Sequence, residues 1–312
     1  MTCGAASVLI IGCGDIGGRV ARLEQAEGST VTGLARSETS AQRLSLRGIK
    51  PFSGDLDVPS SLVHLPVRNS VVYYFAPPPG KGVTDPRMEA FVAALIPPNL
   101  PRRIVLISTT GVYGDCQGAW VTEDRPARPQ ADRAKRRLAA ETALRRWGET
   151  HDVPVVILRV PGIYGPGRLP EERLRSGEPV LREAESPFSN RIHADDLARD
   201  CLAAARRGKA SAIYNICDGH PTTMTDFFNR VADLLKLPRP PAITLEQARR
   251  QLGAGMLSYL AESKRLDNRR MREELGVELH YPTLVRGLPS CLEGMKTSPH
   301  DASEIGGRAG SK

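Results

Sequence analysis

A glycine-rich segment near the N-terminus constrains the fold of this chain more than any other feature. Gly12-Cys13-Gly14-Asp15-Ile16-Gly17 follows an apolar run, Val8 to Ile11, and opens a stretch in which Ile16, Val20 and Leu23 share one helical face. A G-x-G-x-x-G between a strand and a helix binds the pyrophosphate of a dinucleotide, because bare backbone and a helix N-terminus both face the phosphates. We therefore expect a dinucleotide cofactor on Gly12, Cys13, Gly14, Asp15, Ile16 and Gly17.

Short β-branched apolar runs alternate with longer amphipathic stretches over most of the chain. This alternation is typical of parallel strands joined by crossover helices, and near-continuous apolar runs indicate strands covered on both faces. We predict an α/β, Rossmann-type doubly wound parallel sheet with a small C-terminal substrate lobe. The expected strands are 8–11, 30–35, 50–53, 71–76, 104–108, 155–160 and 213–216, and the longest expected helix is 130–149.

Two regions interrupt this alternation and suggest a second unit. Residues 161–190 are rich in Pro, Gly, Arg and Glu, and the region after 219 holds helical patches at 225–235, 245–252 and 263–275. We predict a Rossmann domain of residues 7–160 and 191–220, and a substrate-binding lobe of 161–190 and 221–295. Residues 296–312 carry Gly, Ser and charge with almost no apolar content, so we expect a disordered tail.

The end of the second expected strand indicates which cofactor binds. About 20 residues after the glycines, where an acidic residue would hold the ribose 2′-hydroxyl of NAD, the chain has Arg36 and Ser37. A guanidinium and a hydroxyl hold a 2′-phosphate, which a carboxylate would repel. We therefore favour NADP(H), and the neighbouring Glu38 keeps NAD(H) open.

Further motifs follow in order along the chain. They are Gly54-Asp55-Leu56, Ser108-Thr109-Thr110-Gly111-Val112-Tyr113-Gly114, the segment 158–167 and Arg191-Ile192-His193-Ala194-Asp195-Asp196. In this order they resemble the extended short-chain dehydrogenase/reductase superfamily, of the NAD-dependent epimerase/dehydratase type. The resemblance implies that Asp55, Leu56 and Ala76 contact the cofactor and that Thr109 polarises the reacting oxygen of a substrate.

One expected feature of this superfamily is missing. Its members carry a Tyr and a Lys four residues apart on a helix, where the Lys lowers the pKa of a Tyr that transfers protons. Here Lys135 fits the lysine, but Ala131 occupies the tyrosine position, and none of the seven tyrosines has a lysine four residues later. The chain is in this respect similar to atypical members of the superfamily. Tyr113 and Tyr164 remain alternative acids.

The candidate site residues follow from these motifs. We expect Thr109 and Lys135 to be catalytic, with Lys135 also bonding the nicotinamide ribose, and Arg168 and Arg191 to bind an anionic substrate such as a nucleotide sugar. Thr109 could instead satisfy loop backbone, and Lys135 could lie on a solvated helix face. For His193, a structural bond to Asp195 or Asp196 is favoured over a role in the site.

These features lead to two functional hypotheses. The first is an oxidoreductase or epimerase with a non-standard active site, acting on a nucleotide-sugar-like or small carbonyl substrate. The second is a non-catalytic NADP(H)-binding redox sensor or scaffold protein, motivated by Ala131 at the tyrosine position. Cofactor turnover distinguishes them, because only the first requires it.

Composition and charge narrow the partners. The net charge is +8, but the arginines alternate with Glu and Asp on expected helices, so we predict no nucleic-acid partner. No run approaches the ~18 apolar residues of a membrane span, and we expect a cytoplasmic protein. The six cysteines have neither disulfide nor zinc spacing, so no metal site is predicted. A homodimer is compatible with all of these features.

Overall fold

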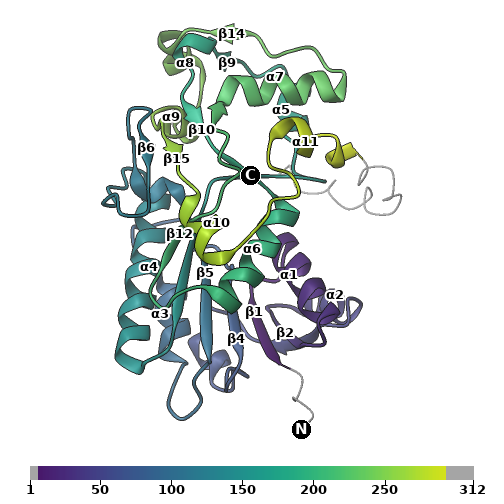
Figure 1. Ribbon diagram of the computed structural model, residues 1–312, viewed down its shortest axis with the longest axis vertical. Helices are drawn as coiled ribbons and strands as arrows, with labels where there is room; N and C mark the ends of the chain where they lie inside the picture. Colours follow the sequence, from purple (N-terminus) through teal and green to yellow (C-terminus); the bar gives the residue numbers. More distant parts are fainter. Residues whose placement is uncertain (1–5, 293–312) are drawn as a thin grey trace, which may run out of the picture.

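A parallel sheet forms the centre of the molecule, as predicted. The computed structural model describes residues 6–292, and its seven-stranded sheet has the order β12-β7-β5-β4-β1-β2-β3 (Figure 1). Each of the seven predicted apolar runs forms one of its strands. These are β1 (Ser7–Ile11), β2 (Thr30–Ala35), β3 (Lys50–Ser53), β4 (Val71–Tyr74), β5 (Arg103–Thr109), β7 (Val155–Val160) and β12 (Ile213–Asn215).

Helices cover both faces of this sheet, which explains why central strands such as β4 and β7 are buried along their whole length. In β1, Val8 and Ile10 belong to the apolar cluster beneath α1 and α6, whereas Leu9 and Ile11 belong to the cluster beneath α3 and α4. The helices are α1 (Asp15–Ala26), α2 (Glu38–Ser45), α3 (Pro86–Ala93), α4 (Asp132–His151) and α6 (Ala194–Arg207). Together the three layers form the Rossmann-type arrangement that the sequence predicts.

The order of the strands indicates at which edge of the sheet a ligand is expected to bind. The chain moves outward from β1 to β2 and β3, then returns to the other side of β1 with β4 and β5. Ligands of open α/β sheets bind where this reversal occurs, at the carboxyl ends of the strands. Gly12 and Gly14 follow β1 at this point.

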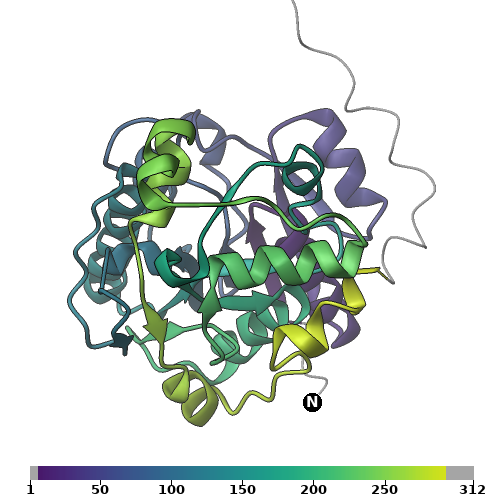
Figure 2. The ribbon, with the colours of Figure 1, turned by 90° about the horizontal axis from the view of Figure 1, so that it is seen from above.

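A smaller lobe lies over the carboxyl ends of the strands, above the sheet in Figure 1 and facing the viewer in Figure 2. Its apolar centre joins Phe227, Phe228 and Val231 of α7 to Leu174 of α5 and Val180 of β9. Its elements are β8 (Gly162–Tyr164), α5 (Glu171–Arg175), β9 (Val180–Leu181), β10 (Phe188–Ser189), β11 (Arg191–His193), β13 (Thr222–Thr223), α7 (Met224–Leu235), β14 (Ala242–Ile243), α8 (Leu245–Gln251), α9 (Ala254–Leu260) and α11 (Leu284–Gly287).

The predicted helix at 263–275 is wrong in its first half, and its second half packs outside the lobe. Residues Arg265–Leu266 form β15, which pairs in parallel with β6 (Trp120–Val121). The helix that follows, α10 (Arg269–Leu275), packs on α6, because Met271 and Leu275 are completely buried in the cluster beneath α1 and α6. Residues 265–275 therefore pack against the domain that contains the central sheet. The predicted tail, 296–312, lies outside the described residues.

The length and the apolarity of a helix decide whether it can cross a membrane. Within residues 6–292, no helix combines the length and the apolarity needed to cross a membrane.

Candidate active site

The turn after β1 has the shape of a phosphate cradle. Gly12 has a φ of +91°, and a Cβ there would lie 2.6 Å from the backbone nitrogen of Ala76, so only glycine fits. A Cβ on Gly17 would lie 2.8 Å from the Gly12 carbonyl oxygen, which brings α1 close to the strand. By contrast, a Cβ on Gly14 would meet no atom within 4 Å, and no side chain caps the N-terminus of α1. The bare backbone and uncapped N–H groups fit a pyrophosphate.

The other predicted residues of this loop support the turn. Ile16 is buried against the sheet, and burial raises the pKa of the Cys13 thiol to about 11, so it remains a neutral packing group. Asp15 opens α1. Burial pushes the pKa of its carboxyl upward, but hydrogen bonds from Arg168 and Arg19 outweigh burial and hold it below its usual value.

Arg36 and Ser37 lie exposed at the end of β2. The Ser37 hydroxyl accepts a hydrogen bond from the backbone nitrogen of Ser40 at 3.2 Å and so caps α2. Arg36 is fully available to solvent beside the positive end of this helix, and Glu38 follows as its first residue. The pair can therefore receive a phosphate at the edge of the sheet.

Asp55, Leu56 and Ala76 lie at the ends of the neighbouring strands. The Asp55 carboxylate accepts a hydrogen bond from the backbone nitrogen of Asp57 at 2.9 Å, which fixes it in the turn after β3. Leu56 and Ala76 are buried, with 7% and 6% of their surfaces exposed. All three positions border the predicted cofactor groove.

A cavity of about 660 Å³ opens beneath the lobe, next to the sheet edge. Its lining is strongly cationic, because Lys264 and six arginines line it, whereas Glu262 is the one carboxylate among its lining residues. The arginines are Arg133, Arg136, Arg137, Arg168, Arg173 and Arg191. A cavity of this charge selects an anionic ligand.

Thr109 lines this cavity at the end of β5. Its Oγ1 accepts a hydrogen bond from the backbone nitrogen of Gly111 at 3.2 Å and caps the short helix Thr110–Tyr113. This is the backbone role that the sequence left as the alternative for Thr109. Its hydroxyl proton is not used in that contact and can still be donated to a ligand.

Lys135 is not brought to the cavity. Its side chain is 43% exposed and forms an ion pair with Asp132 at 3.0 Å on the outer face of α4. Ala131 precedes α4 as its N-cap residue. The α4 residues four apart that do line the cavity are Arg133 and Arg137, which the sequence reasoning missed. The sequence shows this spacing of two arginines, but the pair expected four residues apart on this helix was a tyrosine followed by a lysine.

The two alternative tyrosines lie away from the cavity lining. The Tyr113 hydroxyl donates to Asn215 Oδ1 at 2.8 Å, and burial raises the pKa of Tyr113 to about 12. Tyr164 is completely buried, and burial raises its pKa as well. Neither geometry presents a phenol to a ligand in this cavity.

Arg191 lies at the start of β11 and lines the cavity. Its guanidinium lies 4.2 Å from the ring centre of Phe227, and a Cβ on Gly162 would lie 2.6 Å from its Nη1, so Gly162 leaves it room. It donates to the Asn190 carbonyl at 2.9 Å and forms no ion pair within residues 6–292. Burial lowers the pKa of Arg191 to about 10, which leaves it charged at neutral pH and in need of an anion.

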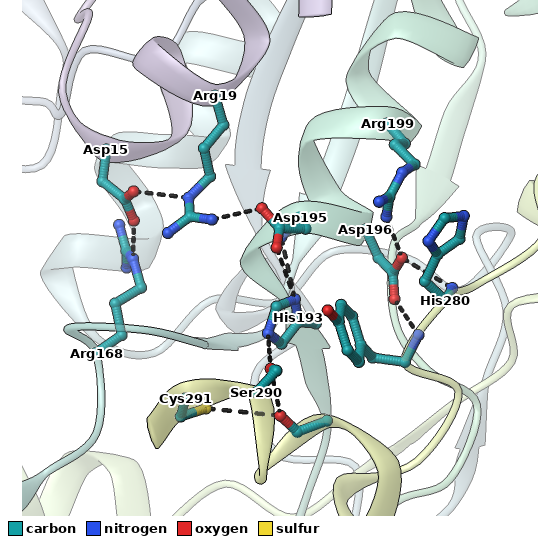
Figure 3. A network of polar contacts seen from close by, with 12 residues as sticks. Asp15, Arg19, Arg168, His193, Asp195, Asp196, Arg199, His280, Ser290 and Cys291 are labelled. Atoms are coloured by element: carbon teal, nitrogen blue, oxygen red, sulfur yellow. Dashed lines mark hydrogen bonds and ion pairs between the residues drawn. The ribbon is translucent and has the colours of Figure 1, made fainter. Parts of the chain in front are cut away.

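A polar network connects the glycine turn to the lobe (Figure 3). Arg168, from the loop after β8, donates to Asp15 at the start of α1, and Arg19 bridges Asp15 to Asp195 of α6. Arg168 also lines the cavity. Arg168 therefore lies between the glycine turn after β1 and the cavity.

His193 has a structural position in the same network. Its Nδ1 accepts a hydrogen bond from the backbone nitrogen of Asp195 at 3.2 Å, so the ring proton is on Nε2, which faces Ser290 Oγ at 3.1 Å. Burial lowers the pKa of His193, which favours this neutral form. With its proton on Nε2, His193 cannot accept one from Ser290, so these residues do not form a hydrolase triad.

No metal centre is apparent in the part of the chain that the structure describes. Residues 6–292 contain no cluster of three or more His, Cys, Asp or Glu side chains placed to hold an ion.

Comparisons with known proteins agree with this geometry. The family described as NAD dependent epimerase/dehydratase matches residues 8–217. Protein YeeZ of Escherichia coli (strain K12) is 30% identical over 294 residues, which cover 88% of this chain and 96% of YeeZ. A functionally unknown conserved protein from Silicibacter pomeroyi DSS has a TM-score of 0.76 at 28% identity, covering 94% of this chain and all of its own.

A more distant structure contains ligands. MoeE5 in complex with UDP-glucose and NAD has a TM-score of 0.68 at 23% identity, covering 93% of this chain and 99% of its own. At this identity the likeness concerns the fold alone.

Proposed function

The chain belongs to the NAD-dependent epimerase/dehydratase family, and on that premise we propose that it is an NADP(H)-dependent oxidoreductase or epimerase acting on a nucleotide-sugar-like substrate. The observation that supports this most directly is the cationic cavity beside the glycine turn, with Thr109 at its floor. When bound, the nicotinamide of the cofactor supplies the group that accepts or donates hydride. The residues of this chain bind and orient the two molecules.

Each part of the cavity has a distinct task in this proposal. Arg191 binds the anionic group of the substrate, because its half-buried side chain forms no ion pair within residues 6–292. The Thr109 hydroxyl donates to the reacting oxygen of the substrate. The lobe covers both and excludes water. A carbonyl substrate without an anionic group would leave Arg191 without its partner, so we favour the nucleotide-linked class.

The preference for NADP(H) rests on the end of β2. Arg36 and the N-terminus of α2 present positive charge where the 2′-phosphate would lie, and no carboxylate precedes Glu38 there. We expect calorimetric titration to give tight binding of NADPH and NADP and weaker binding of NADH and NAD. Arg36→Glu should weaken NADP(H) binding by about 10-fold or more, since it replaces a charge-assisted contact by repulsion.

The matched control is Arg43→Glu, which makes the same charge change at an exposed position at the other end of α2. It should leave the affinities unchanged. Equal affinity of the wild-type protein for all four nucleotides would contradict the NADP(H) preference, and absence of binding by the wild-type protein would contradict the cofactor site.

A test of turnover separates the enzyme from its alternative. If the protein is an oxidoreductase, nucleotide sugars incubated with it and NADP(H) should change the absorbance of the nicotinamide. If it is an epimerase, the hydride returns to the substrate within each turnover, so the nucleotide sugar should be converted while the absorbance stays constant. Thr109→Ala should abolish either change. A panel of nucleotide sugars and small carbonyl compounds that leaves both the absorbance and the compounds unchanged would count against an enzyme.

A second candidate function is a non-catalytic redox sensor. The ion pair between Asp15 and Arg168 favours it, because this pair joins the cofactor turn to the lobe and is placed to pass on cofactor binding. A sensor should show tight binding without turnover and different hydrogen exchange of residues 161–190 with NADPH and NADP. Identical exchange with both redox forms would refute it.

A further inference from the structure

Three guanidinium groups of α4 line the cavity, and two of them, those of Arg133 and Arg137, lie one helical turn apart. The third, that of Arg136, donates to the Gly82 carbonyl at 2.6 Å. Arg133 and Arg137 are four residues apart, so their side chains are neighbours on the helix, and both line the cavity. Like charges at this spacing repel each other. Because both arginines line the cavity, we expect an anion to lie between or beside them.

Arg137 is the less compensated of the two. Its Nη1 donates to the backbone carbonyl of Ala76 at 3.1 Å, which holds the guanidinium beside the glycine turn. Its Nε and Nη2 have no hydrogen-bond partner, and no ion pair involves it, within residues 6–292. Burial lowers the pKa of Arg137, although the carboxylates of Asp85 and Glu141 act in the opposite direction. One edge of the guanidinium is free.

Arg133 is held in place by lobe residues. Its guanidinium lies 3.8 Å from the ring centre of Tyr259, and its Nη1 donates to Ser258 Oγ at 2.5 Å. Glu262 lies 3.9 Å from Arg133, but the same carboxylate pairs more closely with Lys264, at 2.8 Å. Glu262 therefore neutralises the charge of Arg133 only in part, because it also pairs with Lys264. The net charge around Arg133 and Arg137 remains positive.

These arginines form a second anion site, separate from Arg191. Arg191 comes from β11 and packs on Phe227 of α7, whereas Arg137 comes from α4 and contacts Ala76 after β4. Arg191 thus belongs to the lobe side of the cavity, and Arg137 to the sheet side, next to Thr109 and the cofactor turn. A free guanidinium edge donates two parallel hydrogen bonds to the oxygens of a planar carboxylate.

We propose, building on the proposed function, that Arg133 and Arg137 bind a carboxylate at the reacting end of the substrate. The substrate is then a nucleotide-linked sugar acid, with its phosphates on Arg191 and its acid group on α4. This assigns the pair a role in specificity, because a neutral sugar would leave the free edge of Arg137 without an anion and Arg133 with only the shared carboxylate of Glu262.

Calorimetric titration with two matched probes tests the assignment. UDP-glucuronate carries a carboxylate at the position where UDP-glucose carries a hydroxymethyl group. With the full chain and saturating NADP, UDP-glucuronate should bind about 10-fold or more tightly, as charge-assisted hydrogen bonds imply. In Arg137→Gln and in Arg133→Gln the ratio of the two dissociation constants should fall to about 2 or less.

Control variants make the result specific. Arg146→Gln removes the same charge from an exposed position of α4 and should retain the preference. Arg191→Gln should weaken both probes alike, because it acts on the shared phosphates. Arg137→Lys keeps the charge without the planar edge and should retain part of the preference, which checks that loss in Arg137→Gln is not misfolding.

The outcomes distinguish this inference from the proposed function. Equal affinity of the wild-type protein for both probes, or a preference that survives both glutamine variants, overturns the carboxylate site and leaves the proposed function standing. Failure of the wild-type protein to bind either probe overturns the proposed function, and the carboxylate site with it.

Discussion

Beneath Thr109, a buried ion pair joins β7 to α4, and its removal should destabilise the sheet unit strongly. Arg159 and Glu141 are 4% and 2% exposed. The Arg159 guanidinium donates to the two carboxylate oxygens of Glu141 at 3.2 and 2.7 Å, and Ser108 donates to the same carboxylate at 2.5 Å. Glu141→Leu leaves a buried cation without a partner, and Arg159→Met leaves a buried anion.

The expected size follows from the cost of an unpaired buried charge. Each single variant should lower the free energy of unfolding by about 3–5 kcal/mol. At roughly 2–4 °C per kcal/mol for a domain of this size, the melting temperature should fall by about 6–20 °C. The double variant removes both charges and leaves only the Ser108 hydroxyl unpaired, so it should cost about 1 kcal/mol.

Thermal and urea denaturation followed by circular dichroism measure these differences. Glu149→Leu is the matched control, because it removes the carboxylate of an exposed α4 ion pair, Arg145 to Glu149 at 4.0 Å, and should change stability by less than about 1 kcal/mol. Single-variant losses below about 1 kcal/mol, or a double variant as unstable as the sum of the singles, would refute the argument that the buried charges depend on each other.

Three further predictions concern other positions. Gly12→Ala should cost about 2–5 kcal/mol in unfolding free energy and abolish cofactor binding, because it combines strain at φ +91° with a contact at 2.6 Å to Ala76; a variant of wild-type stability would contradict this. Burial raises the pKa of Asp218 to about 7, above its unfolded value, so the free energy of unfolding should fall as pH rises from about 4 to 7. Asp218→Asn should weaken that fall in pH-dependent urea titrations, and an unchanged slope would refute the shift. Gly287→Ala would place a methyl group 2.0 Å from the Tyr164 hydroxyl oxygen and should lower the melting temperature, and a variant that melts like the wild-type protein would argue against this clash.

The sequence alone determined most of the sheet and the cofactor turn. Apolar runs such as Val155 to Val160 and the glycines after Ile11 act through local properties, namely β-propensity, burial on both faces and the freedom of backbone without a Cβ. Those properties are carried by neighbouring residues, so they can be read without knowing what packs on them. The resemblance to the superfamily indicated Thr109 and Arg191, and both line the cavity.

Only the tertiary structure decided which side of α4 lines the cavity. Ala140, Leu144 and Trp147 pack on the sheet and thereby fix the rotation of the helix, which turns Arg133 and Arg137 into the cavity and leaves Lys135 outside. Likewise, β15 pairs with β6, and Arg168 reaches Asp15 although 153 residues separate them. Contacts of this kind depend on how distant elements dock, and no local pattern encodes them.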